Sequence, residues 1–269
     1  MFCQSALRIL GILLLWLLPG WLWAQTLVLI PGFMSQGMDW RFNQVTPALQ
    51  ASGWVDGGNY LMTRNGILNT VQLPQRPERV FYTLSLPNQA PIAYQGRILD
   101  QYLDLIYQQR QEPLILVGHS AGGVVARDWL VRSNRVPVKA LVTIATPHLG
   151  TPLAQLSDWF SRTEMLNLAN MLGFKQLPDA HGLFKDLREE QPGRYLYWLN
   201  HQPHPPLHYA AIVRNSQSPP EVDLIVPRHS QDMNYVYALR GQAERWNTDR
   251  GHFLSREDGY LLARIVSRW

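Results

Sequence analysis

Cysteine and charged residues are both scarce in this sequence of 269 residues. The single cysteine, Cys3, lies near the N-terminus, so the rest of the chain has no partner for a disulfide and depends on its apolar core. Charged residues make up 16% against 46% hydrophobic ones, which favours a globular fold over a disordered chain. The formal net charge of +4 comes mostly from arginines spread along the chain without a block of like charge, so no nucleic-acid-binding surface is expected.

Residues 1–24 are set apart by an apolar run. Their sequence, MFCQSALRILGILLLWLLPGWLWA, has one arginine, an apolar stretch, a Pro-Gly break and a final alanine. This pattern predicts a secretory signal peptide that is cleaved after Ala24, and therefore a secreted or periplasmic protein. Leu22 is bulky for its place in a cleavage site, so an anchor formed by an uncleaved N-terminal segment is the alternative, although the stretch is short for a full membrane span.

Apolar runs alternate with amphipathic stretches along the rest of the chain. Most runs are continuous, as in parallel strands that are covered on both faces. The predicted strands are 26–32, 79–87, 113–118, 139–147, 208–215 and 234–241. Helical patterns are found at 38–52, 91–110, 120–133, in a long region from 151 to about 199, and at 255–267. This order predicts an α/β fold with an open, mostly parallel sheet flanked by helices on both faces.

Two stretches do not follow this alternation. Residues 53–78 look like an irregular excursion, and residues 151–207 contain the amphipathic segment LAQLSDWFSRTEMLNLANMLGF, rich in Leu, Met, Trp and Phe. The sequence has no internal repeat and no low-complexity linker. We therefore expect residues 25–269 to form one domain.

The pentapeptide Gly-His-Ser-Ala-Gly at 118–122 lies where a buried-strand pattern ends and the helical pattern AGGVVARDWLVRS begins. The pattern Gly-x-Ser-x-Gly alone is weak, but this strand-to-helix context is the one that a nucleophilic serine requires. Side chains at 118 and 122 would collide with the neighbouring strand and helix at such a tight corner. The serine would lie at the carboxyl end of a strand, where open α/β sheets bind ligands. Ser120 is therefore predicted to be a nucleophile, and an ordinary turn is the alternative.

At this point the chain resembles the α/β-hydrolase family, and within it the secreted bacterial lipases and esterases. Four landmarks carry the resemblance in the family's order: LVLIPGF (27–33), VGHSAGG (117–123), TIATPHLGTP (143–152), and EVDLIVPRHS (221–230) followed by RGHF (250–253). The chain departs from the family where Pro31 replaces a common histidine and where Leu224 replaces a common glycine after Asp223. The family's first two strands have no room before Thr26, so the resemblance implies a trimmed sheet of about six strands.

The resemblance also implies partners for the serine. Serine is a poor nucleophile until a base takes its proton, and an acid must hold that base in one tautomer. The family's order is Ser, then Asp or Glu, then His. His252 fits the last place, in a short loop before the C-terminal helix, and Asp223 fits the acid's place after the predicted strand 208–215. Asp232 and Glu221 are the fallback choices for the acid.

The oxyanion that forms on the attacked carbonyl needs two backbone donors. The resemblance implies the N–H of Ala121, directly after the nucleophile, and the N–H of Phe33, which matches the family's donor position in the loop after the first strand. A plain structural loop at Phe33 is the alternative.

The other histidines are not expected to take part in catalysis. His119 flanks the nucleophile but points the wrong way to be its base, and His148 lies in the ATPHLG turn, where a structural role is expected. The segment HQPHPPLH (201–208) holds three histidines, but its prolines forbid a helix and it contains no cysteine or carboxylate, so a metal site there is not expected. The family chemistry implies neither metal nor cofactor.

These observations together predict a secreted serine hydrolase that cleaves carboxylic esters, in particular lipid acyl esters, through an acyl-enzyme. Residues 151–207 are expected to include a cap or lid, with a helix packed on the sheet as the alternative. The expected partner is a small-molecule or lipid ester substrate, with transient contact with a lipid surface, and we expect a monomer. The alternatives are a thioesterase, amidase or acyltransferase with the same triad, a membrane-anchored enzyme acting on lipid-linked surface molecules, and a non-catalytic binding module.

Overall fold

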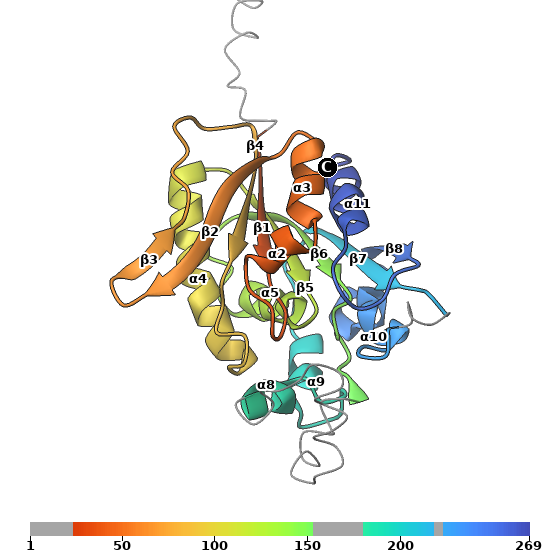
Figure 1. The fold of residues 1–269 in the computed structure, drawn as a ribbon. Helices are drawn as coiled ribbons and strands as arrows, with labels where there is room; N and C mark the ends of the chain where they lie inside the picture. Colours follow the sequence, from red (N-terminus) through yellow and green to blue (C-terminus); the bar gives the residue numbers. More distant parts are fainter. Residues whose placement is uncertain (1–23, 153–179, 218–222) are drawn as a thin grey trace, which may run out of the picture.

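A central sheet between two layers of helices makes up the fold (Figure 1). The structure is a computed structural model that describes residues 24–152, 180–217 and 223–269. The strands are β1 (Gln25–Ile30), β2 (Val55–Thr63), β3 (Gly66–Asn69), β4 (Arg79–Leu84), β5 (Leu114–His119), β6 (Val138–Ile144), β7 (His208–Arg214) and β8 (Ala243–Thr248). The predicted signal peptide lies outside the described residues apart from Ala24.

The helices follow the strands at the expected places. The α-helices are α2 (Asp39–Phe42), α3 (Val45–Ala51), α4 (Ile92–Arg110), α5 (Ala121–Arg132), α8 (His181–Asp186), α9 (Tyr195–Asn200), α10 (Arg228–Gln231) and α11 (Arg256–Val266), and two 3₁₀ turns are η3 (Met233–Tyr235) and η4 (Tyr237–Leu239). Within the described ranges, none of the helices combines the length and the apolar character needed to cross a membrane.

The strand order is β3-β2-β4-β1-β5-β6-β7-β8, and every neighbouring pair except β2 and β3 is parallel. The prediction of a mostly parallel sheet is therefore confirmed. Because parallel strands end at the same edge, the loops that follow β1, β5, β7 and β8 meet at one side of the molecule. The serine, aspartate and histidine singled out above all lie in these loops.

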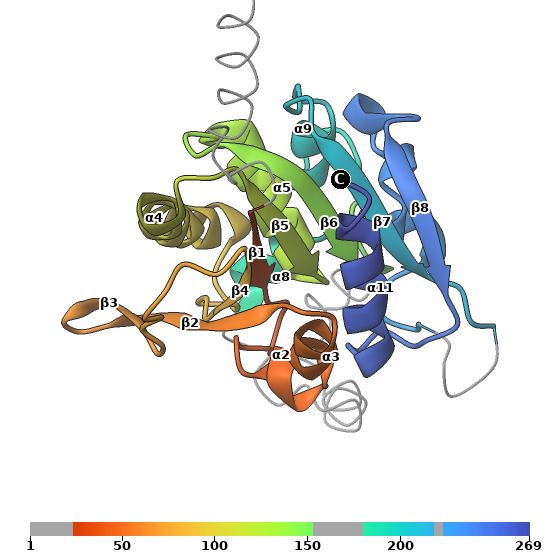
Figure 2. The ribbon, with the colours of Figure 1, turned by 90° about the horizontal axis from the view of Figure 1, so that it is seen from above.

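Alternating side chains of the strands build a core on each face of the sheet. On one face, Val28 and Leu116 pack with α4 and α5. On the other face, Leu27 and Ile115 pack with the apolar sides of α3 and α11. Figure 2 shows α3 and α11 together on one side of the sheet and α4 and α5 on the other. Both faces are covered, which explains why these strands are apolar at nearly every position.

Residues 53–78 were expected to be irregular, and this prediction is wrong. They contain the two strands β2 and β3. They are joined by a two-residue turn and extend the sheet beyond β4, so the sheet has eight strands rather than about six. The two glycines of β2, Gly57 and Gly58, lie at an irregularity where the register against β4 shifts between Asp56 and Asn59. Because this irregularity interrupts the alternation of side chains, hydrophobic periodicity does not predict the strand.

The strand predicted at 234–241 is also wrong. Met233, Val236 and Leu239 are buried at a spacing of three residues, which is the period of the 3₁₀ turns found there. The edge strand comes later, in β8, where exposed and half-buried residues alternate and give no apolar run.

Candidate active site

Ser120 lies at the corner between β5 and α5 in a strained backbone conformation. Its φ is 51° and its ψ is −129°, a combination that costs a non-glycine residue about 1–3 kcal/mol. Two backbone hydrogen bonds hold the corner, from the Ser120 N–H to the Ile144 carbonyl at 2.8 Å and from the Gly123 N–H to the Ser120 carbonyl at 3.1 Å. These hydrogen bonds hold Ser120 in its strained conformation at the carboxyl edge of the sheet.

The glycines around Ser120 are required by close approaches. A Cβ at Gly118 would lie 2.4 Å from the Cα of Gly123 in α5, and a Cβ at Gly122 would lie 2.4 Å from the carbonyl oxygen of Pro31. The predicted collisions at 118 and 122 are therefore confirmed. Gly32 makes a third close approach, because a Cβ there would lie 2.8 Å from the Cβ of Ser120. The loop after β1 thus lies directly against the serine.

The structure brings Ser120, His252 and Asp223 together from three loops. Ser120 Oγ lies 3.0 Å from His252 Nε2, and His252 Nδ1 lies 2.9 Å from Asp223 Oδ2. A carboxylate accepts only, so Nδ1 carries a proton and Nε2 of the neutral ring presents its lone pair to the serine hydroxyl. This geometry lets the imidazole take the proton of the serine.

The Asp223 carboxylate is held in its charged form. Burial raises its pKa, but the hydrogen bond and charge of His252 together with two backbone N–H groups outweigh burial, and the pKa lies below its usual value. The backbone donors are the N–H groups of Ile225 and Val226, both 2.9 Å from Oδ1. Gln231 Nε2 also donates to Oδ2 at 2.9 Å. Sequence analysis missed Gln231, which no motif distinguishes.

The fallback acids take other places. Asp232 pairs with Arg245 at 3.2 Å and accepts a hydrogen bond from the N–H of Asn234, so it caps η3. His229, beside it in the sequence, is exposed. Glu221 lies outside the described residues.

Two buried side chains hold the backbone that carries His252. His119 Nε2 donates to the His252 carbonyl oxygen at 3.0 Å, and burial lowers the pKa of His119 to about 3, so that it stays neutral. Arg214 Nη2 donates to the Phe253 carbonyl oxygen at 3.2 Å. The Arg214 guanidinium is held in turn by Asp258 of α11 at 2.6 and 2.9 Å. These contacts join distant parts of the chain, so the sequence alone does not point to a supporting role for His119, Arg214 or Asp258.

The residues expected to form the oxyanion hole lie beside the serine. Ala121 is buried as the first residue of α5, where N–H groups have no partner within the helix. Phe33 follows Gly32, and its ring packs edge-on against that of Phe184 in α8, with centroids 5.0 Å apart. The contact places α8 beside the loop after β1. The rest of the expected cap, residues 153–179, lies outside the described residues.

Three exposed apolar side chains lie in the loops that approach or supply the three polar residues. Met34 follows Phe33, Leu224 follows Asp223 and Phe253 follows His252, and these side chains are 42%, 81% and 69% exposed. The loops that supply Asp223 and His252 therefore each carry an exposed apolar side chain, and the loop after β1, which lies against Ser120, carries a third.

The histidines of 201–208 diverge instead of converging. His201 stacks on Tyr237, His204 contacts the buried guanidinium of Arg127, and His208 stacks on Trp269. In the ranges that the structure covers, no three His, Cys, Asp or Glu side chains are grouped so as to hold a metal ion.

Comparison with known proteins gives matches in sequence and in fold. Residues 81–179 match the family model of the PGAP1-like alpha/beta domain. A GPI inositol-deacylase of Cryptococcus neoformans var. neoformans serotype D (strain B-3501A) is 40% identical over 61 residues, which are 23% of this chain and 8% of the relative. The chain thus spans a small part of that longer protein.

Solved structures match over most of the chain. The mature Bacillus licheniformis lipase BlEst2 superposes with a TM-score of 0.62 at 16% identity, covering 91% of each chain. The metagenomic carboxyl esterase MGS0156 superposes with a TM-score of 0.56 at 13% identity, covering 91% of this chain and 76% of its own. At these identities the similarity shows the fold.

Proposed function

We propose that this chain, which has the α/β-hydrolase fold of bacterial lipases and esterases, is a serine hydrolase that cleaves carboxylic esters of lipids. The observation that carries the proposal is the continuous hydrogen-bonded chain from Ser120 through His252 to Asp223. It ends on a strained serine at the edge of the sheet where this type of fold binds ligands.

In the proposed reaction, Ser120 Oγ attacks the ester carbonyl carbon while His252 Nε2 takes the hydroxyl proton. Asp223 keeps the proton on Nδ1 and stabilises the imidazolium without taking that proton. The N–H groups of Ala121 and Phe33 stabilise the oxyanion. The imidazolium then protonates the leaving alcohol, which departs and leaves an acyl-enzyme. A water molecule, deprotonated by the same imidazole, releases the carboxylic acid and restores the serine.

An acyl lipid is the proposed substrate because apolar side chains rim the site. Met34, Leu224 and Phe253 would lie beside an acyl chain or a lipid surface that approaches the serine. The relatives described above are called a lipase, a carboxyl esterase and a GPI inositol-deacylase, and these names share the removal of acyl groups. We also propose that the chain is exported and cleaved after Ala24, since β1 begins at the next residue.

The proposal is tested with a fluorophosphonate probe and a series of p-nitrophenyl esters from acetate to palmitate. We expect the probe to label Ser120 and the rate to be highest on the longer chains. Ser120→Ala and His252→Ala should each lower kcat by about 10⁴ or more, and Asp223→Asn by about 10²–10⁴, because the three groups act as a unit. Higher rates on matched thioesters or amides would keep the mechanism and change the substrate.

His229→Ala and Asp232→Asn are the matched controls, because they lie close in sequence to Asp223 but outside the hydrogen-bonded chain. Both should stay within about tenfold of the parent if they remain folded. Loss of activity in His229→Ala but not in His252→Ala would show that the base is assigned wrongly. Absence of both labelling and ester hydrolysis would refute the proposed function.

A further inference from the structure

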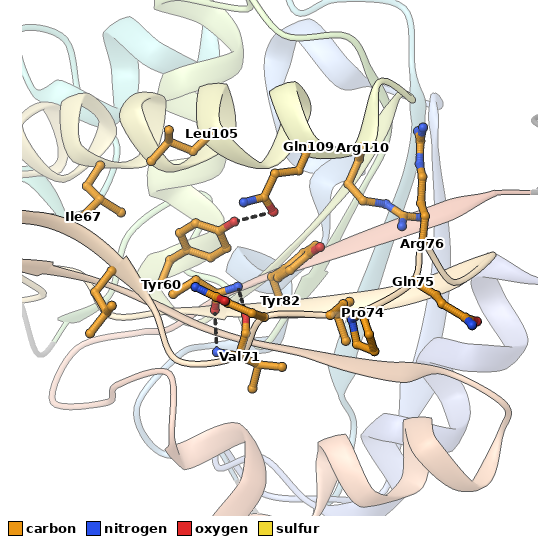
Figure 3. A pocket seen from close by; sticks show the side chains of 14 residues that line it. Tyr60, Ile67, Val71, Pro74, Gln75, Arg76, Tyr82, Leu105, Gln109 and Arg110 are labelled. Atoms are coloured by element: carbon orange, nitrogen blue, oxygen red, sulfur yellow. Dashed lines mark hydrogen bonds between the residues drawn. The ribbon is translucent and has the colours of Figure 1, made fainter.

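A cavity of about 690 Å³ lies under the β2–β3 hairpin, away from Ser120. Its walls come from the hairpin and the segment that follows it, from β4, and from the C-terminal part of α4 (Figure 3). Such a volume is typical of sites that bind small organic molecules. The insertion that interrupts the expected strand-helix alternation thus builds a pocket as well as extending the sheet.

The position of Tyr82 separates this cavity from the serine. Tyr82 of β4 is level with Val28 of β1, which is level with Leu116 of β5. Ser120 is four residues further along the chain, just past the end of β5, so the backbones of Tyr82 and Ser120 are about 16 Å apart from strand geometry. The cavity is therefore separate from the site around Ser120 and lies on the face of the sheet that α4 covers.

One wall of the cavity presents hydrogen-bond donors without acceptors. Tyr82 is 3% exposed and lines the cavity, and its hydroxyl makes no hydrogen bond to any residue that the structure describes. The Tyr82 ring packs closely against the backbone of Gly57, where a Cβ would lie 2.4 Å from Tyr82 Cε1. The Tyr60 hydroxyl donates to Gln109 Oε1 at 2.8 Å, which leaves the Gln109 amide nitrogen as a donor toward the cavity (Figure 3).

Two cationic side chains, Arg76 and Arg110, line the cavity beside these donors. Arg110 is buried and its Nε and Nη2 lie 3.0 and 2.8 Å from Glu112 Oε1. Arg76 Nη2 contacts the other oxygen of Glu112 at 3.4 Å. Two guanidinium groups thus share one carboxylate. Arg110 lines the cavity, and its Nη1 has no hydrogen-bond partner among the described residues, so it is a third type of donor available there.

Apolar side chains line another part of the cavity. Ile67 of β3, Leu73 of the following segment and Leu105 of α4 are partly buried and line the cavity. A ligand that satisfies both parts of the cavity needs acceptor oxygens with negative charge at one end and an aliphatic part at the other.

We propose that this cavity binds an amphiphilic organic anion, with a carboxylate or phosphate group against Tyr82 and Arg110 and an aliphatic chain against Leu105. The anion supplies the acceptors that the donor wall lacks. Burial raises the pKa of Tyr82 further than the nearby arginines lower it, so its hydroxyl keeps the proton that it donates.

Calorimetric titration of the full chain tests the site. The probes are octanoate and octyl phosphate, with octanol as the uncharged control and inorganic phosphate as the control without an aliphatic chain. At least one of the two anions should bind at least about tenfold more tightly than octanol, because a hydrogen bond to a charged group contributes about 1.5–3 kcal/mol. The difference between the two anions identifies the head group.

Two variants place the binding in this cavity. Tyr82→Phe removes only the hydroxyl and should weaken binding of the preferred anion about tenfold. Leu105→Trp should fill the cavity and abolish binding. The matched controls are Tyr94→Phe, which removes an exposed hydroxyl of α4, and Ile98→Trp, two turns before Leu105 on the same helix and outside the cavity lining. Neither control should change the affinity.

Thermal melts confirm that each variant folds, and Tyr82→Phe keeps the test decisive if Leu105→Trp does not fold. The proposal is refuted if neither anion binds at millimolar concentration, if octanol binds as tightly as the anions, or if Tyr82→Phe leaves the affinity unchanged. These outcomes do not depend on the labelling of Ser120 by a fluorophosphonate, so the proposed anion site is tested independently of the proposed ester hydrolysis.

Discussion

The ion pair between Arg214 and Asp258 is buried and lies outside the proposed catalytic residues. Both side chains are fully buried, and the carboxylate accepts two hydrogen bonds from the guanidinium. It also accepts one from the N–H of Ser255, which makes the capping box at the start of α11. Asp258→Asn keeps the shape of the side chain but removes the charge. The arginine would then be a buried cation without its counter-ion.

Removing one partner of a buried ion pair costs about 3–5 kcal/mol, because the remaining charge cannot regain its hydration. Domains are stable by about 5–15 kcal/mol, so Asp258→Asn should remove a large part of the total. For a chain of this size each kcal/mol shifts the melting temperature by about 2–4 °C, so Tm should fall by about 6–20 °C.

Urea unfolding followed by tryptophan fluorescence measures the free energy of unfolding. The matched control is Glu257→Gln, one residue earlier, whose partner Arg250 is exposed, and it should cost less than about 1 kcal/mol. The paired variant Arg214→Met with Asp258→Leu should recover much of the stability, since an apolar pair replaces the ion pair. A cost below about 1 kcal/mol for Asp258→Asn would refute this reasoning.

The same paired variant separates stability from positioning. Without Arg214 the carbonyl of Phe253 loses its donor, and the loop that carries His252 is held less firmly. We therefore expect ester hydrolysis to stay below that of the parent, through kcat more than KM, even where the melting temperature recovers. Recovery of both together would show that Arg214 only stabilises the fold.

Two further predictions concern acid and export. Burial lowers the pKa of His119 and of His204 to about 3, and it lowers that of His148 well below its usual value, so the folded protein binds fewer protons than the unfolded chain below about pH 6.5. The free energy of unfolding should therefore fall as pH decreases from about 6.5 toward 3, by up to about 1.4 kcal/mol per pH unit for each histidine. Urea unfolding at several pH values should show that this free energy depends less steeply on pH in His204→Gln than in the parent. An equal dependence on pH would contradict the prediction. Terminal sequencing of the exported protein should give Gln25 as the first residue, whereas Met1 retained in the membrane fraction would replace secretion with anchoring.

Much of the fold could be predicted because its strands are buried on both faces. Runs such as 114–118 are apolar at every position for that reason, and they mark the sheet without an alignment. β2 was missed because its Gly57-Gly58 irregularity interrupts the pattern, and β8 was missed because an edge strand needs few apolar residues. The region 234–241 was misassigned because tertiary packing, which local propensity does not contain, selects 3₁₀ turns there.

The sequence also predicts one part of the candidate site and not another. Ser120 stands in a local motif, and chain order within the resemblance led to His252 and Asp223, which the structure brings within hydrogen-bond distance. His119 and Arg214 act on backbone carbonyls more than thirty residues away in the chain. A side chain that donates to a distant backbone carbonyl leaves no spacing in the sequence to be recognised. The donors that support the histidine loop could therefore be found only in three dimensions.

The place of β1 has a consequence for how the chain is made. β1 is the first strand within the described part of the chain, yet it lies in the middle of the sheet between β4 and β5, and β5 ends at His119. About 90 residues must therefore be added after β1 before both its edges can pair, which at ordinary rates of synthesis takes about 4–18 s. For that time at least one edge of this apolar strand stays open to other chains, even after β4 can pair with the other edge, which is a hazard for aggregation. The yield of native protein should thus depend on holding the nascent chain apart from its neighbours until β5 has emerged.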